Sequence, residues 1–197
     1  GGLAMVNIGV SLFFAEISGS AVADVAAMGS ILIPQMKKRG YSKEFSAAVT
    51  SSSASLAIII PPSIPMILYA ASANTSVEQL FVAGVVPGLL GAGGLMLVAY
   101  LFAKRYDFPT EAAFNLPRLR ETFVEGLPAF ALPVIILGGI FGGYVTATEA
   151  AGLAVLASLV VSAWYGNLDL RHLRRAMLDG GMQTAVVMLL VAASVLM

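Results

Sequence analysis

Two short stretches rich in hydroxyl groups interrupt an otherwise apolar chain. The first, at residues 17–29, reads ISGSAVADVAAMG, and the second, at residues 51–63, reads SSSASLAIIIPPS. Serine hydroxyls, together with the carbonyl groups that a broken helix leaves free, are oxygen ligands suited to an alkali cation that has lost its water. The amide end of a half-helix suits a carboxylate. The sequence therefore predicts ion and anion chemistry at these two places.

The first stretch lies between two apolar arms that together cover residues 3–36. With roughly 15 residues each, the arms would reach about 22–25 Å, which is less than the hydrocarbon core of about 30 Å. We therefore expect a re-entrant helical hairpin with Ser18, Gly19 and Ser20 at its tip. Glycine permits the turn, and Ser20 is expected to cap the second arm.

The second stretch belongs to residues 45–72 and contains Pro61 and Pro62, which cannot sit inside one uninterrupted helix. We expect two half-helices that meet at these prolines, with Ser63 just after them. Discontinuous helices that meet near the middle of a membrane point to a secondary-transporter binding site. Two plainer interpretations stay open: the serines form only a packing face, or the prolines only kink one helix.

Composition places both stretches in a membrane protein. Of the 197 residues 58% are hydrophobic and only 11% are charged, whereas about 25% of a soluble domain is charged. A multi-span, all-α membrane protein is the expected class. Zero net charge argues against a nucleic-acid partner, and the absence of cysteine excludes disulfides and thiolate metal sites. The opening GGLAMVN and the apolar end predict a fragment of a longer protein.

Charge spacing predicts how the chain crosses the bilayer. A crossing needs roughly 20 residues, and the uncharged or apolar stretches long enough for one are 79–103, 126–148, 150–168 and 180–197. Lysine and arginine fall in three clusters: Lys37, Lys38, Arg39 and Lys43; Lys104, Arg105, Arg118 and Arg120; Arg171, Arg174 and Arg175. The positive-inside rule puts all three on the cytoplasmic side.

Two further stretches, residues 110–127 and 169–179, mix charges with apolar side chains as interfacial helices do. For the second, a plain solvated loop fits equally well. At an outer turn, Thr146 or Thr148 with Glu149 is expected to form a helix cap.

Two carboxylates, Glu16 and Asp24, fall near the predicted hairpin tip. A carboxylate inside a membrane is costly and usually functional. Asp24 is expected to brace the hairpin by accepting hydrogen bonds from backbone amides of the second arm, with direct ligation as the alternative. Glu16 is either a functional carboxylate inside the membrane or a side chain that reaches the membrane interface.

The order of these motifs resembles one known family. SGSAVAD is followed by IPQMKKRGY, IIIPPSIPMILYA, LFVAGVVPGLL and GGIFGGYVTATEAAGLAVL. This arrangement resembles the large membrane subunit of the tripartite ATP-independent periplasmic (TRAP) transporters, the DctM-like permeases. The resemblance implies an elevator-type transporter with an inverted repeat. Residues 1–78 would be the first-repeat part of the transport domain, 79–126 a transmembrane helix with a cytoplasmic interfacial arm, and 127–197 the start of the second repeat.

The resemblance also implies a function, which is not enzymatic. Such permeases sit as multi-pass proteins in the bacterial inner membrane and import an organic acid, such as a C4-dicarboxylate or sialic acid, with sodium as the coupling ion. A periplasmic substrate-binding protein delivers the acid, and a small membrane subunit, sometimes fused, completes the permease. The second hairpin and its ion site would lie outside this chain.

The site residues follow from matching this chain to the family motifs. Substrate binding is assigned to Ser18, Gly19, Ser20, Pro61, Pro62 and Ser63. A sodium site is assigned to Ser18, Ser20, Ser53, Ser55 and Ser63, with Asp24 as a structural residue nearby. The acid carried, the sodium stoichiometry and the fusion of the small subunit stay open.

Three other functions can be compared with these sequence features. A sodium/carboxylate symporter of similar architecture that uses no binding protein fits the same physical features. An intramembrane serine hydrolase needs a base beside Ser18 or Ser20, and the single histidine, His172, is about 150 residues away in sequence. A channel should carry polar faces along several helices, whereas polarity here is confined to two points.

Overall fold

The structure, a computed structural model, describes residues 2–106, 108, 116–166 and 168–195. Every regular element in these ranges is helical, which confirms the all-α prediction. The elements are α1 (Gly2–Ser18), α2 (Ala21–Lys38), α3 (Lys43–Ala54), the short 3-10 helix η1 (Ser55–Ile58), α4 (Ile64–Ala73), α5 (Val77–Arg105), α6 (Leu116–Phe141), α7 (Ala147–Trp164) and α8 (Leu170–Val195).

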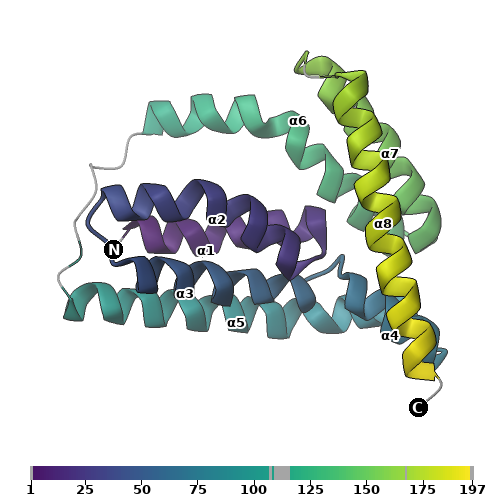
Figure 1. Ribbon diagram of the computed structural model, residues 1–197, viewed down its shortest axis with the longest axis horizontal. Coiled ribbons are helices and arrows are strands. Elements are labelled where there is room, and N and C mark those ends of the chain that lie inside the picture. Colours follow the sequence, from purple (N-terminus) through teal and green to yellow (C-terminus); the bar gives the residue numbers. More distant parts are fainter. Residues whose placement is uncertain (1, 107, 109–115, 167, 196–197) are drawn as a thin grey trace.

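The predicted hairpin is present as α1 and α2, which lie side by side and are joined by a two-residue connection (Figure 1). Ser20 caps α2 as expected, because its hydroxyl accepts a hydrogen bond of 3.4 Å from the amide of Ala23. The described α1 has 17 residues, a length of about 25 Å.

The proline segment is broken, as predicted. α3 continues into η1 and ends at Ile58, and α4 begins only at Ile64. Ser63 is the N-cap of α4, and Pro65 in the first turn costs no hydrogen bond there. A single kinked helix is therefore excluded.

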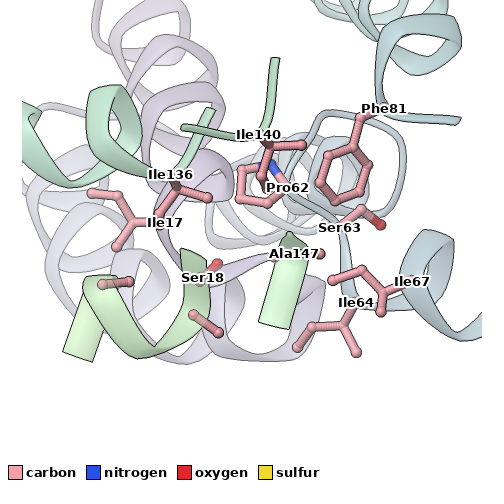
Figure 2. Close-up of a pocket in the computed structure, with 13 residues that line it drawn as sticks. Ile17, Ser18, Pro62, Ser63, Ile64, Ile67, Phe81, Ile136, Ile140 and Ala147 are labelled. Carbon is pink, nitrogen blue, oxygen red and sulfur yellow. The ribbon is translucent and has the colours of Figure 1, made fainter. Parts of the chain in front are cut away.

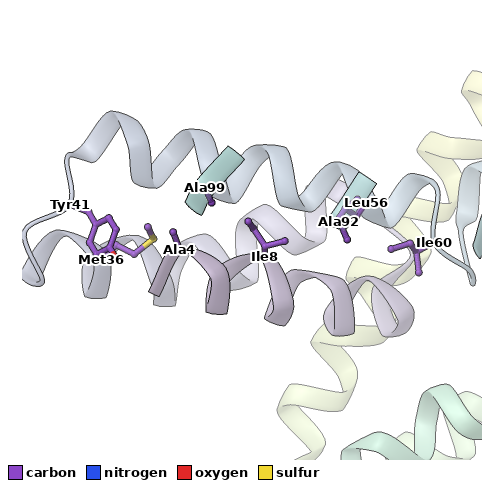
Figure 3. Close-up of a cluster of buried hydrophobic side chains, with 8 residues drawn as sticks. All are labelled: Ala4, Ile8, Met36, Tyr41, Leu56, Ile60, Ala92 and Ala99. Atoms are coloured by element: carbon purple, nitrogen blue, oxygen red, sulfur yellow. The ribbon is translucent and has the colours of Figure 1, made fainter. Parts of the chain in front are cut away.

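Alanines and larger apolar side chains form the core that joins α1, α2, η1 and α5. The main core runs along α1 between α2, α3 and α5 (Figure 3), and its members are Ala4, Ile8, Met36, Tyr41, Leu56, Ile60, Ala92 and Ala99. Because lipid is as apolar as a leucine side chain, helices in a membrane gain stability from close packing rather than from leaving water. Alanines at these contacts allow the close approach.

Two glycines of α5 form a notch for the proline break. A methyl group at Gly84 would overlap the carbonyl oxygen of Ile59 and the end of Met66, and one at Gly88 would overlap Ile60. Both glycines are buried. The break therefore rests directly on the α5 backbone.

The rest of the chain forms three more long helices. Three helical stretches are long and apolar enough to cross a membrane: Val77–Arg105, Ala147–Trp164 and Leu170–Ala193. α6 carries a shorter apolar segment, Gly126–Phe141. Large apolar side chains of α7 and α8, such as Leu156 and Leu189, are exposed, as expected where the surroundings are lipid or further helices.

Two predicted stretches are continuous with the helix that follows them. The interfacial stretch and the span at 126–148 share one helix, α6 (Leu116–Phe141), which contains Pro128 and Pro133 and bends along its length (Figure 1). The stretch at 169–179 is neither a loop nor a separate helix, because α8 begins at Leu170 and continues into the apolar stretch. In both cases the charged residues extend the helix that follows. Residues 110–115 of the first stretch lie outside the described residues.

The first two basic clusters lie at one end of the bundle. An aromatic group ties the α2–α3 turn to the end of α5: Tyr41 contacts Phe108 with ring centroids 4.8 Å apart, and Phe45 contacts Phe102 at 5.8 Å. The third cluster lies at the α7–α8 turn, and these two helices cross the direction of α5 (Figure 1). The placement of all three clusters on one side of a membrane stays a prediction.

The glycine notch gives a stability test. We expect Gly84→Ala to lower the thermal unfolding midpoint of the purified protein, because overpacking costs about 1–3 kcal/mol. Gly93→Ala is the matched control, since a methyl group at Gly93 meets nothing within 4 Å. Equal midpoints for the two variants in a thermal unfolding assay would contradict the notch.

Candidate functional site

The hairpin tip touches the proline break through backbone groups. The amide of Ile64 donates a hydrogen bond of 3.3 Å to the carbonyl of Gly19. Gly19 has a φ of +58°, and a methyl group there would lie 2.9 Å from the carbonyl oxygen of Pro62. Glycine is required at this position because it alone adopts this backbone without strain and leaves room for Pro62.

A cavity of about 220 Å³ opens beside this contact (Figure 2). Four elements besides the tip surround it: α4, α5, α6 and α7. Its lining residues are Ile17, Ser18, Gly19, Pro62, Ser63, Ile64, Ile67, Phe81, Ile136, Ile140, Ala147, Ala151 and Ala154.

The polar groups at this cavity are hydroxyls and helix ends. The hydroxyl of Ser63 donates a hydrogen bond of 2.7 Å to the carbonyl of Ile58, and the Ser18 hydroxyl accepts one of 3.4 Å from the amide of Ser20. α4 and α7 both begin among the lining residues, at Ile64 and Ala147. Helix N-termini carry partial positive charge. The described lining includes no charged side chain, and the amides of Ile64 and Met66 in the first turn of α4 already donate to Gly19 and Ser63.

Four of the six residues assigned to the substrate lie together at this cavity: Ser18, Gly19, Pro62 and Ser63. Of the other two, Ser20 faces its own helix as the cap of α2, and Pro61 is buried beside Pro62. The substrate assignment itself stays a prediction.

The residues assigned to sodium do not form one group. Ser18 and Ser63 line the cavity, whereas Ser53 is fully buried with its hydroxyl 3.1 Å from that of Ser11. Ser55 is exposed and donates a hydrogen bond of 2.6 Å to the carbonyl of Ser52. The serines of the second stretch thus point in different directions.

Asp24 is buried with 0% of its surface exposed. In the described part of the chain neither carboxylate oxygen has a hydrogen-bond partner, so the bracing bonds to backbone amides are not seen. The hydroxyl of the cap residue Ser20 accepts the hydrogen bond of the Ala23 amide. Asp24, one turn further along α2, faces Ser11 of α1 instead. Glu16 is half-buried on α1.

The sequence reasoning missed the far wall of the cavity. Phe81 comes from α5, Ile136 and Ile140 come from α6, and three alanines come from α7. The alanines at 147, 151 and 154 follow the i, i+4, i+7 spacing of one helix face. That spacing was the available signal, but alanines alone do not distinguish a cavity wall from an ordinary packing face.

The predicted cap before α7 is confirmed as a full capping box. The amide of Glu149 donates to the Thr146 hydroxyl at 3.3 Å, and the Glu149 carboxylate accepts from the amide of Thr146 at 2.8 Å. The box fixes where α7 begins and therefore where Ala147 meets the cavity.

Nothing at the cavity supports hydrolysis. His172 lies at the start of α8, largely exposed, with Nδ1 3.1 Å from the Asp169 carboxylate. The described lining residues include no histidine, lysine or acid that would activate Ser18 or Ser63.

Comparison with known proteins matches residues 1–197 to the DctM component of the tripartite ATP-independent periplasmic transporters. The chain is 40% identical over its full length to the C4-dicarboxylate TRAP transporter large permease protein DctM of Pseudomonas aeruginosa, of which it covers 46%. It is 44% identical over 83% of its length to the isethionate TRAP transporter permease protein DctMQ of Oleidesulfovibrio alaskensis, covering 26% of that protein. It is 35% identical over 97% of its length to the sialic acid TRAP transporter permease protein SiaT of Haemophilus influenzae, covering 31%.

These relatives are named as transport proteins rather than enzymes. The chain spans less than half the length of each of them. With a family match along its whole length and 40% identity to a large permease of that family, this chain belongs to the DctM family of TRAP transporter large permeases.

Proposed function

We propose that this chain supplies one half of the binding site of a permease that imports an organic acid by sodium coupling across the bacterial inner membrane. One observation carries the proposal. Two interrupted helices meet at one cavity, where the carbonyl of Gly19 and the amide of Ile64 bind each other between the tip and the break.

Sodium would bind on the carbonyl side of this junction. α1 ends at Ser18, and the chain after Ile58 leaves the helical hydrogen-bond pattern, so both places offer carbonyl oxygens that no helix uses. The hydroxyls of Ser18 and Ser63 add two further oxygens at the cavity. Such oxygens replace the water shell of a sodium ion.

The organic acid would bind on the amide side. α4 and α7 begin at the cavity, and the positive ends of their dipoles favour a negatively charged group. A bound sodium ion would add a full positive charge nearby. Binding of the acid would then be stronger when sodium is present, which is the coupling that a symporter needs.

The cavity is the right size for part of such a site. At about 220 Å³ it is smaller than the 300–1,000 Å³ typical of small-molecule pockets, and the chain covers 46% of the Pseudomonas aeruginosa relative. We expect the remaining sequence of a full permease to close the cavity from the opposite side with a second hairpin.

A periplasmic binding protein and a small membrane subunit are the proposed partners. The name of the Oleidesulfovibrio alaskensis relative, DctMQ, combines two components in one chain, so the small subunit of this protein is either separate or fused. The relatives are named for C4-dicarboxylate, isethionate and sialic acid, and an organic anion is the substrate class that we propose for this protein.

The tip geometry gives the first functional test. We expect Gly19→Ala in the intact permease to reduce sodium-dependent uptake at least about tenfold, because a left-handed backbone costs an alanine about 1–2 kcal/mol and Pro62 leaves no room for the methyl group. Initial uptake rates in proteoliposomes with an inward sodium gradient measure this.

Gly9→Ala is the matched control for that test. Gly9 lies on the same helix, and a methyl group there meets nothing within 4 Å. Wild-type uptake by the Gly19 variant, at wild-type sodium dependence, would refute the role of the tip.

Dependence on a binding protein separates the two symporter hypotheses. We expect uptake by the intact permease only when the cognate periplasmic binding protein, loaded with its acid, is added outside the vesicles. Equal uptake of free acid without that protein would instead identify a binding-protein-independent symporter.

A further inference from the structure

A second group of oxygen atoms lies inside the helix bundle, apart from the tip cavity. Ser11 of α1, Asp24 of α2 and Ser53 of α3 each have 0% of their surface exposed. None of them lines the tip cavity. Three separate helices therefore each bury a polar side chain outside the tip cavity.

The two serines are arranged so that their hydroxyl oxygens can turn lone pairs towards a cation. The Ser53 hydroxyl is 3.1 Å from the Ser11 hydroxyl and also 3.1 Å from the carbonyl of Thr50. When Ser53 donates its proton to Thr50, the lone pairs of both hydroxyl oxygens are free to face a cation. Ser11 also faces the carboxyl group of Asp24, so the three side chains are neighbours.

Asp24 needs a positive partner that the described residues do not provide. Neither carboxylate oxygen has a hydrogen-bond partner among them. A buried carboxylate without a partner is strongly unfavourable, and such residues in membrane proteins mark ion sites. The helices packed around it carry the charged groups Glu16 on α1 and Lys43 and Glu44 on α3, while η1 carries none. Lys43 is ten residues before Ser53 on α3, about 15 Å along the helix.

We propose that Asp24, Ser11 and Ser53 bind a monovalent cation, sodium, at an inner site distinct from the one at the hairpin tip. The inference rests on the proposed sodium coupling, and it adds a second ion to this half of the permease. An ion held between α1, α2 and α3 fastens the hairpin to the broken helix. Both interrupted elements would then move as one body when the site is occupied.

The experiment measures sodium binding without transport. Purified intact permease is titrated with ²²Na⁺ in choline chloride buffer, and the ions bound per permease are counted. We expect Asp24→Asn to lose one bound sodium, and Ser53→Ala to weaken one site at least about tenfold, a loss of one ligand. Ser51→Ala is the matched control, because Ser51 lies on the same helix but is exposed.

A double variant separates the inner site from the tip. Ser63→Ala removes a hydroxyl from the tip cavity and the N-cap of α4, and it leaves Ser11, Asp24 and Ser53 in place. The double variant with Asp24→Asn should therefore lose sodium binding at both sites. If Asp24→Asn and Ser53→Ala bind the wild-type number of ions with wild-type affinity, the inner site is refuted while the tip proposal survives. If wild-type permease binds no sodium at all, the proposed function fails with it.

Thermal unfolding provides a second measurement that does not depend on counting ions. Binding to the folded state raises the unfolding midpoint, so replacing choline with sodium should stabilise wild-type permease more than the Asp24→Asn variant. In choline alone the variant should unfold at a higher temperature than wild type, because it lacks an uncompensated charge. A wild-type midpoint that follows pH rather than sodium, with that pH dependence lost in Asp24→Asn, would overturn the inference in favour of a proton.

Discussion

Backbone polar groups inside a membrane must be satisfied by the protein, and the two interruptions in this chain create several that no helix uses. Some of these groups are satisfied at the junction of the tip and the break, where the amide of Ile64 donates a hydrogen bond to the carbonyl of Gly19. The hydroxyls of Ser20 and Ser63 cap the helices that follow them, α2 and α4. The starts of α4 and α7 and the hydroxyls of Ser18 and Ser63 lie at a shared cavity. The junction that satisfies the interrupted helices is therefore also the place where we propose that an ion and an acid bind.

Close packing places this junction. Lipid gives helices little reason to associate through apolar area, so contact depends on how closely backbones approach. The backbone of α5 contacts the break at Gly84 and Gly88, and alanines allow α1 and its neighbours to approach closely. On the opposite side, a smaller core of Phe81, Ile140 and Ala150 joins α5, α6 and α7. The cavity lies where these two packed groups meet, and its open side is available to the rest of a longer permease.

The serine oxygens lie in two separate places, at the tip cavity and inside the helix bundle. Ser18 and Ser63 belong to the cavity, whereas Ser53 joins Ser11 and Asp24 inside the bundle. In our proposals, the oxygens at the cavity would bind the substrate and a coupling ion. Those inside the bundle would bind a second ion and hold the hairpin against α3.

Local chemistry was enough to predict the elements of this protein. Proline breaks, serine caps and the lengths of apolar arms act within a few residues, so the hairpin, the broken helix, the cap at Ser20 and the box at Thr146 followed from sequence. Membership of the family also followed from the motifs. Which side chains meet was decided by tertiary structure. Residues two apart on a helix point about 200° apart, so Ser53 faces the core while Ser55 faces outward. Only the packed helices decide that rotation, and for the same reason the alanine face of α7 and the unpartnered Asp24 became visible only in the folded chain.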